Sequence, residues 1–98
     1  MTITKNQNGT TLTIGVEGRL DTVTAPELEK EIAAVADGVN ELTVDFAKLD
    51  YISSAGLRVL LSAHKNFAKK GGMTITNVNE TVMDIFDVTG FKDILNIR

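Results

Sequence analysis

The residues best placed to do chemistry in this chain are the two adjacent serines of Ser53-Ser54-Ala55-Gly56, which precede the largely aliphatic segment Leu57–Leu61. Small residues here allow the backbone amides at the start of a helix to point outward. Such an N-terminus carries about half a positive charge and several unpaired N–H donors, so it favours a phosphate. A phosphoserine would therefore be tolerated by the fold, and it would add about −1.5 to −2 charges to an exposed surface. The simpler interpretation is structural, because serine is among the best helix N-caps and capping alone accounts for either residue.

Other kinds of chemistry have less support in the sequence. His64 is the only histidine, so no multi-histidine metal site can form, and its position within an apolar helical arc favours a partly buried side chain over a catalytic base. Asp21, Asp45 and Asp50 are better explained as solvated loop acids than as a pair at the roughly 5–10 Å separation that acid–base hydrolysis requires. No Walker-type or G-x-G-x-x-G phosphate loop is present. We therefore predict no catalytic residue, no metal site and no cofactor.

The elements that must position the serine turn follow from the hydrophobic periodicity. Asn8-Gly9 lies between two alternating segments, which predicts a β-hairpin of residues 2–7 and 10–17. A strand is expected over 41–46, a linking stretch over 47–53, and a helix from about 54 to 70. Next come a strand region over 73–78, a helix from 79 or 80 to 88 closed by Gly90, and a candidate edge strand over 94–97.

The helix between the hairpin and the strand at 41–46 has a marked start signal. Thr24-Ala25-Pro26-Glu27 reads as a capping box, in which Thr24 caps the first-turn amides and Glu27 reaches back to the Thr24 amide. Gly38 is placed to end this helix in a left-handed conformation. The order of strands and helices predicts an α/β sheet with right-handed crossovers.

Composition limits the classes of function. The 98 residues suffice for one domain, and their 43% hydrophobic share is ordinary for a globular protein. The chain has no cysteine, no signal peptide is read at its start, and its apolar stretches are far too short to span a bilayer, which favours a cytoplasmic protein without direct membrane contact. A net charge of −3 and an aromatic content of 5% argue against binding to nucleic acid.

Three segments together resemble a known family. Gly18-Arg19-Leu20-Asp21 leading into a helix, the Ser53–Leu61 turn and helix, and Val82–Phe91 with its Gly90-Phe91 ending occur in the order and at the spacing of STAS domains, in the branch of single-domain bacterial anti-sigma factor antagonists. The resemblance covers essentially the whole chain. It implies one STAS domain over residues 1–98, with a mixed, mostly parallel β-sheet and helices packed mainly on one face.

The resemblance also implies a partner-switching function without enzyme activity. The unphosphorylated protein would bind an anti-sigma factor that is also a serine kinase. Phosphorylation from MgATP of a serine in the turn would release the complex, and a metal-dependent serine phosphatase would reset it. Nothing requires more than a monomer. Two alternatives stay open: a STAS subunit of an ABC-type lipid or anion transporter assembly, and a regulatory module that binds a nucleotide or small anion at the turn.

The family pattern indicates which serine of the turn is phosphorylated. Many members read Asp-Ser-Ser/Thr-Gly at the turn, whereas here Ser53 takes the position of the acid and Ala55 lacks a hydroxyl. This departure favours Ser54 as the phosphorylation site, with Ser53 as the fallback. The resemblance implies that the partner is contacted by residues of the turn and of the loop after the second strand: Asp21, Ser53, Ser54, Gly56, Leu57 and Arg58. Asp21 could equally be a loop acid that caps a nearby backbone amide.

A basic stripe is visible in the sequence without any reference to the family. Arg58, Ser62, Lys65 and Lys69 follow helical spacings opposite the apolar arc of the helix. Most such stripes are solvated faces. In an acidic protein, however, a basic surface beside the serines could also meet an acidic partner.

Overall fold

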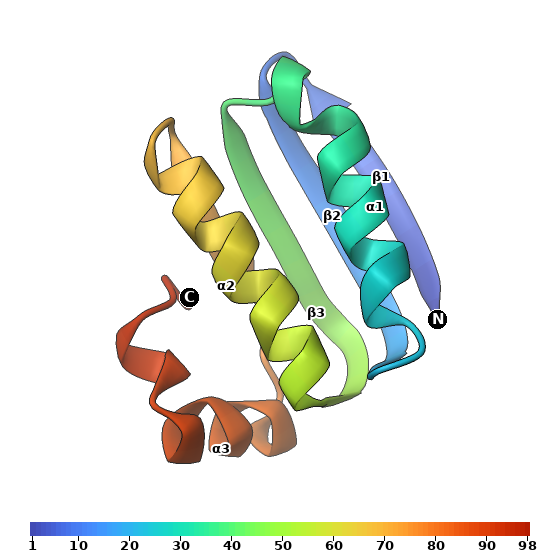
Figure 1. Ribbon diagram of the computed structural model, residues 1–98, viewed down its shortest axis with the longest axis vertical. Coiled ribbons are helices and arrows are strands. Elements are labelled where there is room, and N and C mark those ends of the chain that lie inside the picture. Colours follow the sequence, from blue (N-terminus) through green and yellow to red (C-terminus); the bar gives the residue numbers. More distant parts are fainter.

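The structure, a computed structural model, describes all residues from 1 to 98. The chain runs through strands β1 and β2, helix α1, strand β3, helix α2, strand β4 and helix α3 (Figure 1). Their bounds are Thr2–Asn8, Thr11–Leu20, Ala25–Val35, Glu41–Ile52, Ser54–Ala68, Gly72–Thr76 and Glu80–Thr89. Short 3-10 helices occupy Ala36–Gly38 and Phe91–Asp93.

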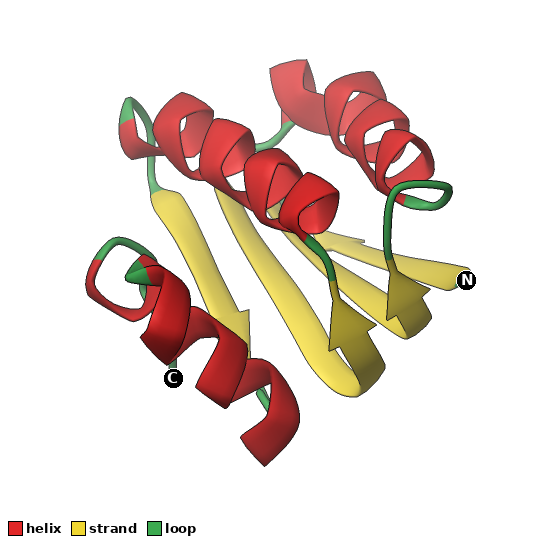
Figure 2. Cartoon of the chain, turned by 60° about the horizontal axis from the view of Figure 1, so that its bottom comes forward, coloured by secondary structure: helices red, strands yellow, loops and turns green.

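The four strands form one sheet in the order β1-β2-β3-β4. The β1–β2 pair is antiparallel and the other two pairs are parallel, so the sheet is mixed and mostly parallel, as predicted. Helices α1 and α2 lie side by side on one face of this sheet (Figure 2). Helix α3 contacts β3, as α2 does, and its Phe86 ring lies 6.5 Å from that of Phe46.

The core lies between the helices and the sheet face that they cover. Twenty-three buried hydrophobic residues form one cluster, and no polar or charged residue is buried with them. Strand residues with a period of two supply one side of it, for example Leu12, Ile14 and Val16 in β2. The uncovered face of the sheet carries polar residues such as Thr13, Thr43 and Thr74, which lie in one row across β2, β3 and β4. None of the helices combines the length and apolar character needed to cross a membrane.

Strand β3 is the largest departure from the predicted elements. Residues 47–52 were expected to link a strand to a helix, but they continue β3 and pair with the second half of β2. Register shifts between Gly15 and Glu17 and between Gly18 and Arg19 interrupt the regular alternation in this half. Leu49 and Ile52 are therefore three residues apart and break the period of two that marks a strand, although both side chains are buried.

Smaller corrections concern turns and the C-terminus. Asn8 pairs with Thr11, so the hairpin turn is Gly9-Thr10 rather than Asn8-Gly9, with a positive φ of 64° at Gly9 only. Gly38 is not left-handed, because α1 passes into a 3-10 turn that ends at the extended Val39. Residues 94–97 form no strand and contribute only a bridge between Ile75 and Ile97. Gly90 closes α3 with a φ of 80°, as predicted.

Candidate functional site

Two strand-to-helix junctions meet at one edge of the sheet. Leu20 and Ile52, the last residues of the parallel strands β2 and β3, are directly paired. The pairing continues one step further, because the Ser53 amide donates a hydrogen bond to the Leu20 carbonyl at 2.9 Å. Asp21 and Ser53 therefore leave the sheet beside each other, as the carboxyl ends of adjacent parallel strands must. This juxtaposition defines the candidate site.

The β3–α2 junction is short, with Ser53 as its one linking residue. Ser53 has extended backbone angles of φ −97° and ψ 176° and is the N-cap of α2. Its hydroxyl accepts a hydrogen bond from the Gly56 amide at 3.4 Å, which is long for such a bond. The Leu57 amide donates to the Ser53 carbonyl at 2.9 Å and closes the first helical turn. The predicted helix start is thus confirmed, and Ser53 has the capping role that serine commonly has.

Ser54 differs from its neighbour in exposure and bonding. It is the first residue of α2, it is exposed, and its hydroxyl makes no hydrogen bond within the protein. Arg58 lies one turn further along the helix and is also exposed. Of the two predicted candidates, Ser54 is therefore the serine whose hydroxyl is free for reaction.

Two of the predicted partner contacts, Gly56 and Leu57, lie in the interior. Leu57 is 5% exposed and belongs to the core. A Cβ at position 56 would come within 2.8 Å of the Ile52 and Leu20 side chains and 3.0 Å of the Leu20 carbonyl oxygen. Both residues pack α2 closely against the sheet, because the apolar side of this amphipathic helix faces the core. They therefore offer a partner no exposed side chain. Only a glycine at 56 permits that approach.

Asp21 organises the β2–α1 junction. Its Oδ1 accepts hydrogen bonds from the amides of Val23 at 3.0 Å and Thr24 at 3.1 Å. The predicted capping box is wrong, since the Thr24 side chain makes no cap bond to the helix. The Thr24 hydroxyl donates instead to the Arg19 carbonyl at 2.8 Å and accepts from the Asp21 amide at 2.8 Å. The Asp21 carboxylate thus takes the Thr24 amide, which the sequence assigned to Glu27, while the Glu27 amide donates to the Thr24 carbonyl at 3.0 Å.

The charge of Asp21 is stabilised by these bonds. The Thr24 amide, followed by the Thr24 hydroxyl, the Val23 amide and the nearby Arg19, lowers the pKa of the Asp21 carboxyl below its ordinary value of 3.8, and partial desolvation offsets this only in part. Arg19 lies with its Nε 4.0 Å from Asp21 Oδ2, and its guanidinium sits 4.5 Å from the centre of the Tyr51 ring. Sequence reasoning did not single out Arg19 or Tyr51. The β2–β3 register that pairs them was the missing signal.

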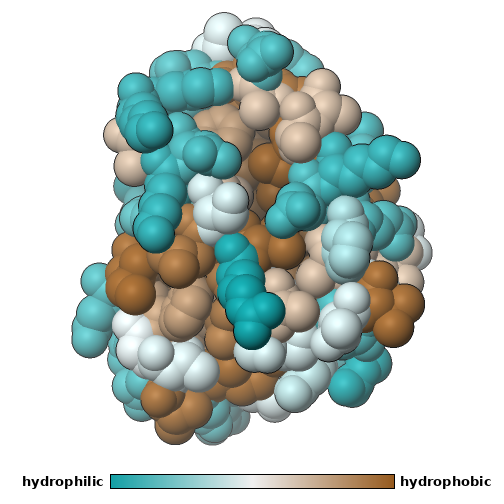
Figure 3. All heavy atoms as spheres, viewed as in Figure 1, coloured by the Kyte–Doolittle hydropathy of each residue, from teal (hydrophilic) through white to brown (hydrophobic).

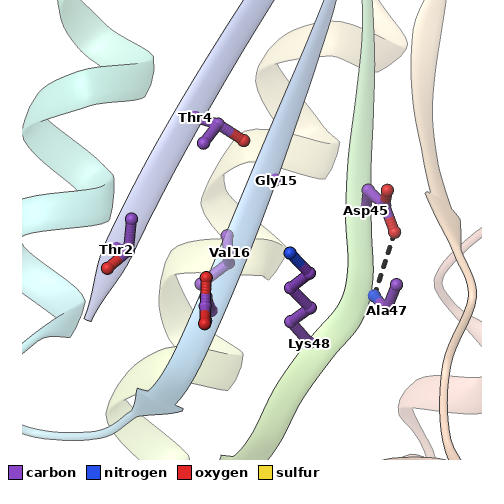
Figure 4. A pocket seen from close by; sticks show the side chains of 8 residues that line it. Thr2, Thr4, Gly15, Val16, Asp45, Ala47 and Lys48 are labelled. Atoms are coloured by element: carbon purple, nitrogen blue, oxygen red, sulfur yellow. Dashed lines mark hydrogen bonds between the residues drawn. The ribbon is translucent and has the colours of Figure 1, made fainter.

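The larger of the two main hollows lies elsewhere, on the uncovered face of the sheet (Figure 4). It has a volume of about 180 Å³, and its lining includes the carboxylates of Glu17 and Asp45 and a single cation, Lys48. Asp45 already accepts hydrogen bonds from the Ala47 amide at 2.9 Å and from Asn77 at 3.0 Å. Two carboxylates against one cation make a poor environment for a nucleotide phosphate. The hollow therefore gives the nucleotide-binding alternative no support.

His64 and Asp50 do not join the site, and Asp45 and Asp50, predicted to be loop acids, both lie within β3 because this strand continues to Ile52. His64 is half-buried on α2, and its Nδ1 is buried without a hydrogen-bond partner. Asp50 is exposed within β3. Neither residue makes a hydrogen bond or an ion pair with the serine turn, and no group of three or more potential metal ligands comes together in the structure.

Together, the fold and the site describe a small α/β domain in which an exposed hydroxyl and an ionised carboxylate flank the start of a helix. The chain belongs to the STAS domain family, whose model matches residues 2–98. This agrees with the family resemblance inferred from the sequence.

Known proteins of similar sequence and structure carry regulatory names. The chain is 30% identical over 92 residues to the anti-sigma-B factor antagonist of Bacillus subtilis (strain 168), covering 93% of this chain and 84% of that protein. The crystal structure of an anti-sigma factor antagonist from Mycobacterium paratuberculosis superposes with a TM-score of 0.86 at 26% identity, covering 98% of this chain and 83% of that one. The phosphorylated form of the Bacillus cell fate determinant SpoIIAA shares the fold, with a TM-score of 0.76 at 17% identity over 99% of this chain and 91% of that one.

Proposed function

We infer that this protein is an anti-anti-sigma factor that works by partner switching. In its unphosphorylated form it binds a serine-kinase anti-sigma factor, and phosphorylation of Ser54 releases it. A metal-dependent serine phosphatase restores the binding form. The protein acts as a substrate and a binding module in the cytoplasm, as a monomer, and catalyses no reaction itself.

The observation that carries this proposal is the exposed, unbonded hydroxyl of Ser54 at the first position of α2. A kinase needs such access to its acceptor oxygen. The names of the sequence relatives, anti-sigma factor antagonists, supply the biological context. The ionised carboxylate of Asp21 and the exposed Arg58 add polar groups that a partner docked over Ser54 would meet.

The electrostatics of the turn explain how one phosphate could act as a switch. A phosphate on Ser54 lies at the positive end of the α2 dipole, so the domain itself is expected to keep its fold. The same group brings about −1.5 to −2 charges to a surface that already carries the Asp21 carboxylate. A partner that docks on this surface without a matching cation would lose its contacts through desolvation and repulsion.

Ser53 is the weaker acceptor for two structural reasons. Its hydroxyl caps α2 through the Gly56 amide, so modification would disturb the helix start. Its position beside Asp21 would also bring a phosphate next to an ionised carboxylate, which raises the cost of the phosphorylated state. Both reasons support Ser54.

The test is incubation with the host's kinase-type anti-sigma factors and MgATP, followed by intact-mass measurement and site mapping. We expect one phosphate on the wild type and none on Ser54→Ala, which should still bind the kinase. Ser54→Asp should bind poorly. Ser62→Ala, a second exposed serine on the same helix, is the matched control and should be phosphorylated as the wild type is. Normal phosphorylation of Ser54→Ala would refute the site, and a wild type that no such kinase binds or modifies would refute the function.

A further inference from the structure

The charges of this protein are strongly segregated along the chain. The sequence contains 13 acidic and 10 basic residues, yet no aspartate or glutamate occurs from Tyr51 to Asn79. This stretch includes all of α2 and carries the cations Arg58, Lys65, Lys69 and Lys70. The flanking helices are acidic by comparison, with Glu27, Glu29 and Glu31 in α1 and Glu80, Asp84 and Asp87 in α3. Helix α2 is thus a cationic element in an acidic molecule.

Three of these cations form a continuous stripe, which we name the basic ridge: Arg58, Lys65 and Lys69. All three are exposed, and their spacings of seven and four residues place them on one side of the helix axis. The first and the last are eleven positions apart, which corresponds to about 16 Å along a helix. Ser54 lies one turn before Arg58 on the same side, so the proposed phosphorylation site is at one end of the ridge.

The ridge cations have no partners within the chain. The ion pairs of the structure join Lys5 to Glu31 and Arg19 to Asp21, and none involves the ridge. Lys70 offers a contrast, because its Nζ donates to the carbonyls of Ala36 at 2.6 Å and Val39 at 3.0 Å and lies 5.0 Å from the centre of the Phe67 ring. Lys70 therefore serves the fold, while the ridge does not. The helix-bearing surface on which the ridge lies carries hydrophilic side chains interspersed with hydrophobic ones (Figure 3).

We propose that the basic ridge docks an acidic surface of the protein partner, and that a phosphate on Ser54 weakens this docking by cancelling charge at its end. The inference rests on the proposed function and adds the chemistry of the partner surface. A phosphate of about −1.5 to −2 charges offsets about half to two thirds of the three positive charges of the ridge. Release then has two causes: local repulsion at the turn, and loss of the field that steers the partner along α2.

A protein surface fits the ridge better than nucleic acid or an anionic membrane does. Three cations over about 16 Å neutralise few phosphates, and nucleic-acid affinity depends on how many are neutralised. The acidic residues of α1 and α3 on either side, together with the net charge of −3, would repel an extended polyanion. An acidic patch of limited size on a protein avoids that repulsion.

The experiment measures association of the wild type and of Lys65→Glu/Lys69→Glu with the kinase-type anti-sigma factor, by stopped flow or surface plasmon resonance. The matched control is Lys92→Glu/Arg98→Glu, which makes the same change in net charge at exposed positions near the C-terminus. We expect the ridge variant to associate about tenfold more slowly or worse, and the control to stay within about twofold of the wild type. Lys65→Gln/Lys69→Gln should give an intermediate loss, which guards against an effect of the introduced glutamates.

Salt and phosphorylation complete the test. Wild-type association should fall steeply as sodium chloride rises from about 50 to 500 mM, and the ridge variant should show a shallower dependence. Association rates that fall equally in the ridge variant and the control, or that fall in neither, would refute the proposal that the ridge docks the partner. So would binding of duplex DNA or of phosphatidylglycerol vesicles that depends on Lys65 and Lys69.

The two proposals fail in distinguishable ways. If the wild type neither binds nor is modified by any kinase-type anti-sigma factor, the proposed function is wrong, and the ridge inference that rests on it is wrong as well. If the wild type binds and Ser54 is phosphorylated while the ridge variant matches the control, only the ridge inference is wrong.

Discussion

The two strand-to-helix junctions at the functional edge of the sheet are built in opposite ways. The β2–α1 junction uses the four residues from Asp21 to Thr24, and two side chains bind its amides and carbonyls with distances of 2.8 to 3.1 Å. The β3–α2 junction has one linking residue, and its single side-chain cap spans 3.4 Å. The first junction is held by hydrogen bonds, and the second is held by close packing at Gly56.

This difference explains how the second junction can accept a modification. A turn held by side-chain hydrogen bonds loses them when a hydroxyl or carboxylate is altered. A turn held by apolar packing on its inner side leaves its outer hydroxyl free, so Ser54 can change its charge without disturbing Leu57 or Gly56. The comparison predicts that the stability of the β3–α2 junction depends on the space available for a side chain at position 56. The stability of the β2–α1 junction should depend on its polar side chains.

The largest effect is expected for Gly56→Ala. The new methyl group would lie 2.8 Å from carbon atoms of Ile52 and Leu20, so either α2 or the ends of the strands must shift. Overpacking of this kind typically costs about 1–3 kcal/mol of unfolding free energy. Urea unfolding measures it, with Gly38→Ala as the control, since a Cβ at position 38 meets nothing within 4 Å and the residue has no positive φ. A Gly56→Ala protein as stable as the control would contradict the packing account.

The next effect compares the two caps directly. Asp21→Ala removes the acceptor for two amides, and Ser53→Ala removes one long bond. We expect Ser53→Ala to cost about 0.5–1 kcal/mol, at the lower end for an N-cap serine, and Asp21→Ala to cost more. Thermal or urea unfolding of the pair gives the order, and amide hydrogen exchange at Val23 and Thr24 should speed up only in Asp21→Ala. The reverse order would mean that the short junction depends on its serine.

A smaller effect concerns pH. Because the native pKa of Asp21 is lowered, the carboxylate stabilises the fold above the ordinary, unfolded-state pKa of 3.8, and this contribution is lost as the pH falls through the native value. Asp21→Asn keeps an acceptor oxygen but not the charge. We expect the difference in unfolding free energy between wild type and Asp21→Asn to be constant from pH 7 to about 5 and to shrink below about 4. If the difference in unfolding free energy between the two proteins grew at low pH, the turn would not stabilise the charged form of Asp21.

The smallest effect is expected for Arg19→Ala. Arg19 is 62% exposed at its side chain, and its contact with Asp21 is at the 4.0 Å limit of an ion pair. Exposed pairs of this kind contribute about 0–1 kcal/mol, and the Tyr51 contact adds a similarly small amount. Unfolding in low salt and in about 0.5 M sodium chloride would separate the two contributions, because salt screens the ion pair. If Arg19→Ala lowered the unfolding free energy more than Asp21→Ala does, the ranking of these contacts would be wrong.

Local patterns in the sequence identified most of the elements. Alternation in β2 and the first half of β3, the helical spacing in α2, and Gly90 at the end of α3 are short-range signals, and the structure follows them. The second half of β3 was missed for a physical reason. Its register shifts arise from pairing with β2, so the period of two is interrupted where a distant strand dictates the geometry.

The candidate site was predictable to a similar degree. A serine before an apolar helical run marks a helix N-terminus, so the site of Ser53 and Ser54 is a local property of the chain. The exposure of Ser54, in contrast with the cap bond of Ser53, depends on how α2 rests on the sheet. The capping box of α1 was predicted wrongly because Asp21 rather than Glu27 accepts the Thr24 amide, and because the Thr24 hydroxyl bonds to the backbone of Arg19 and Asp21; the path of the chain out of β2 decides both.

The sequence by itself determined that this chain is an α/β protein of the STAS family with a serine turn at the start of a basic helix. These features depend on side-chain periodicity, on local capping preferences and on residue order, all of which act over a few positions. Tertiary structure alone decided that Asp21 lies beside Ser53, that Gly56 and Leu57 are buried, and that the ridge cations have no acid to pair with. Each of these depends on the register of β2 against β3 and on the packing of α2, which bring together residues more than thirty positions apart.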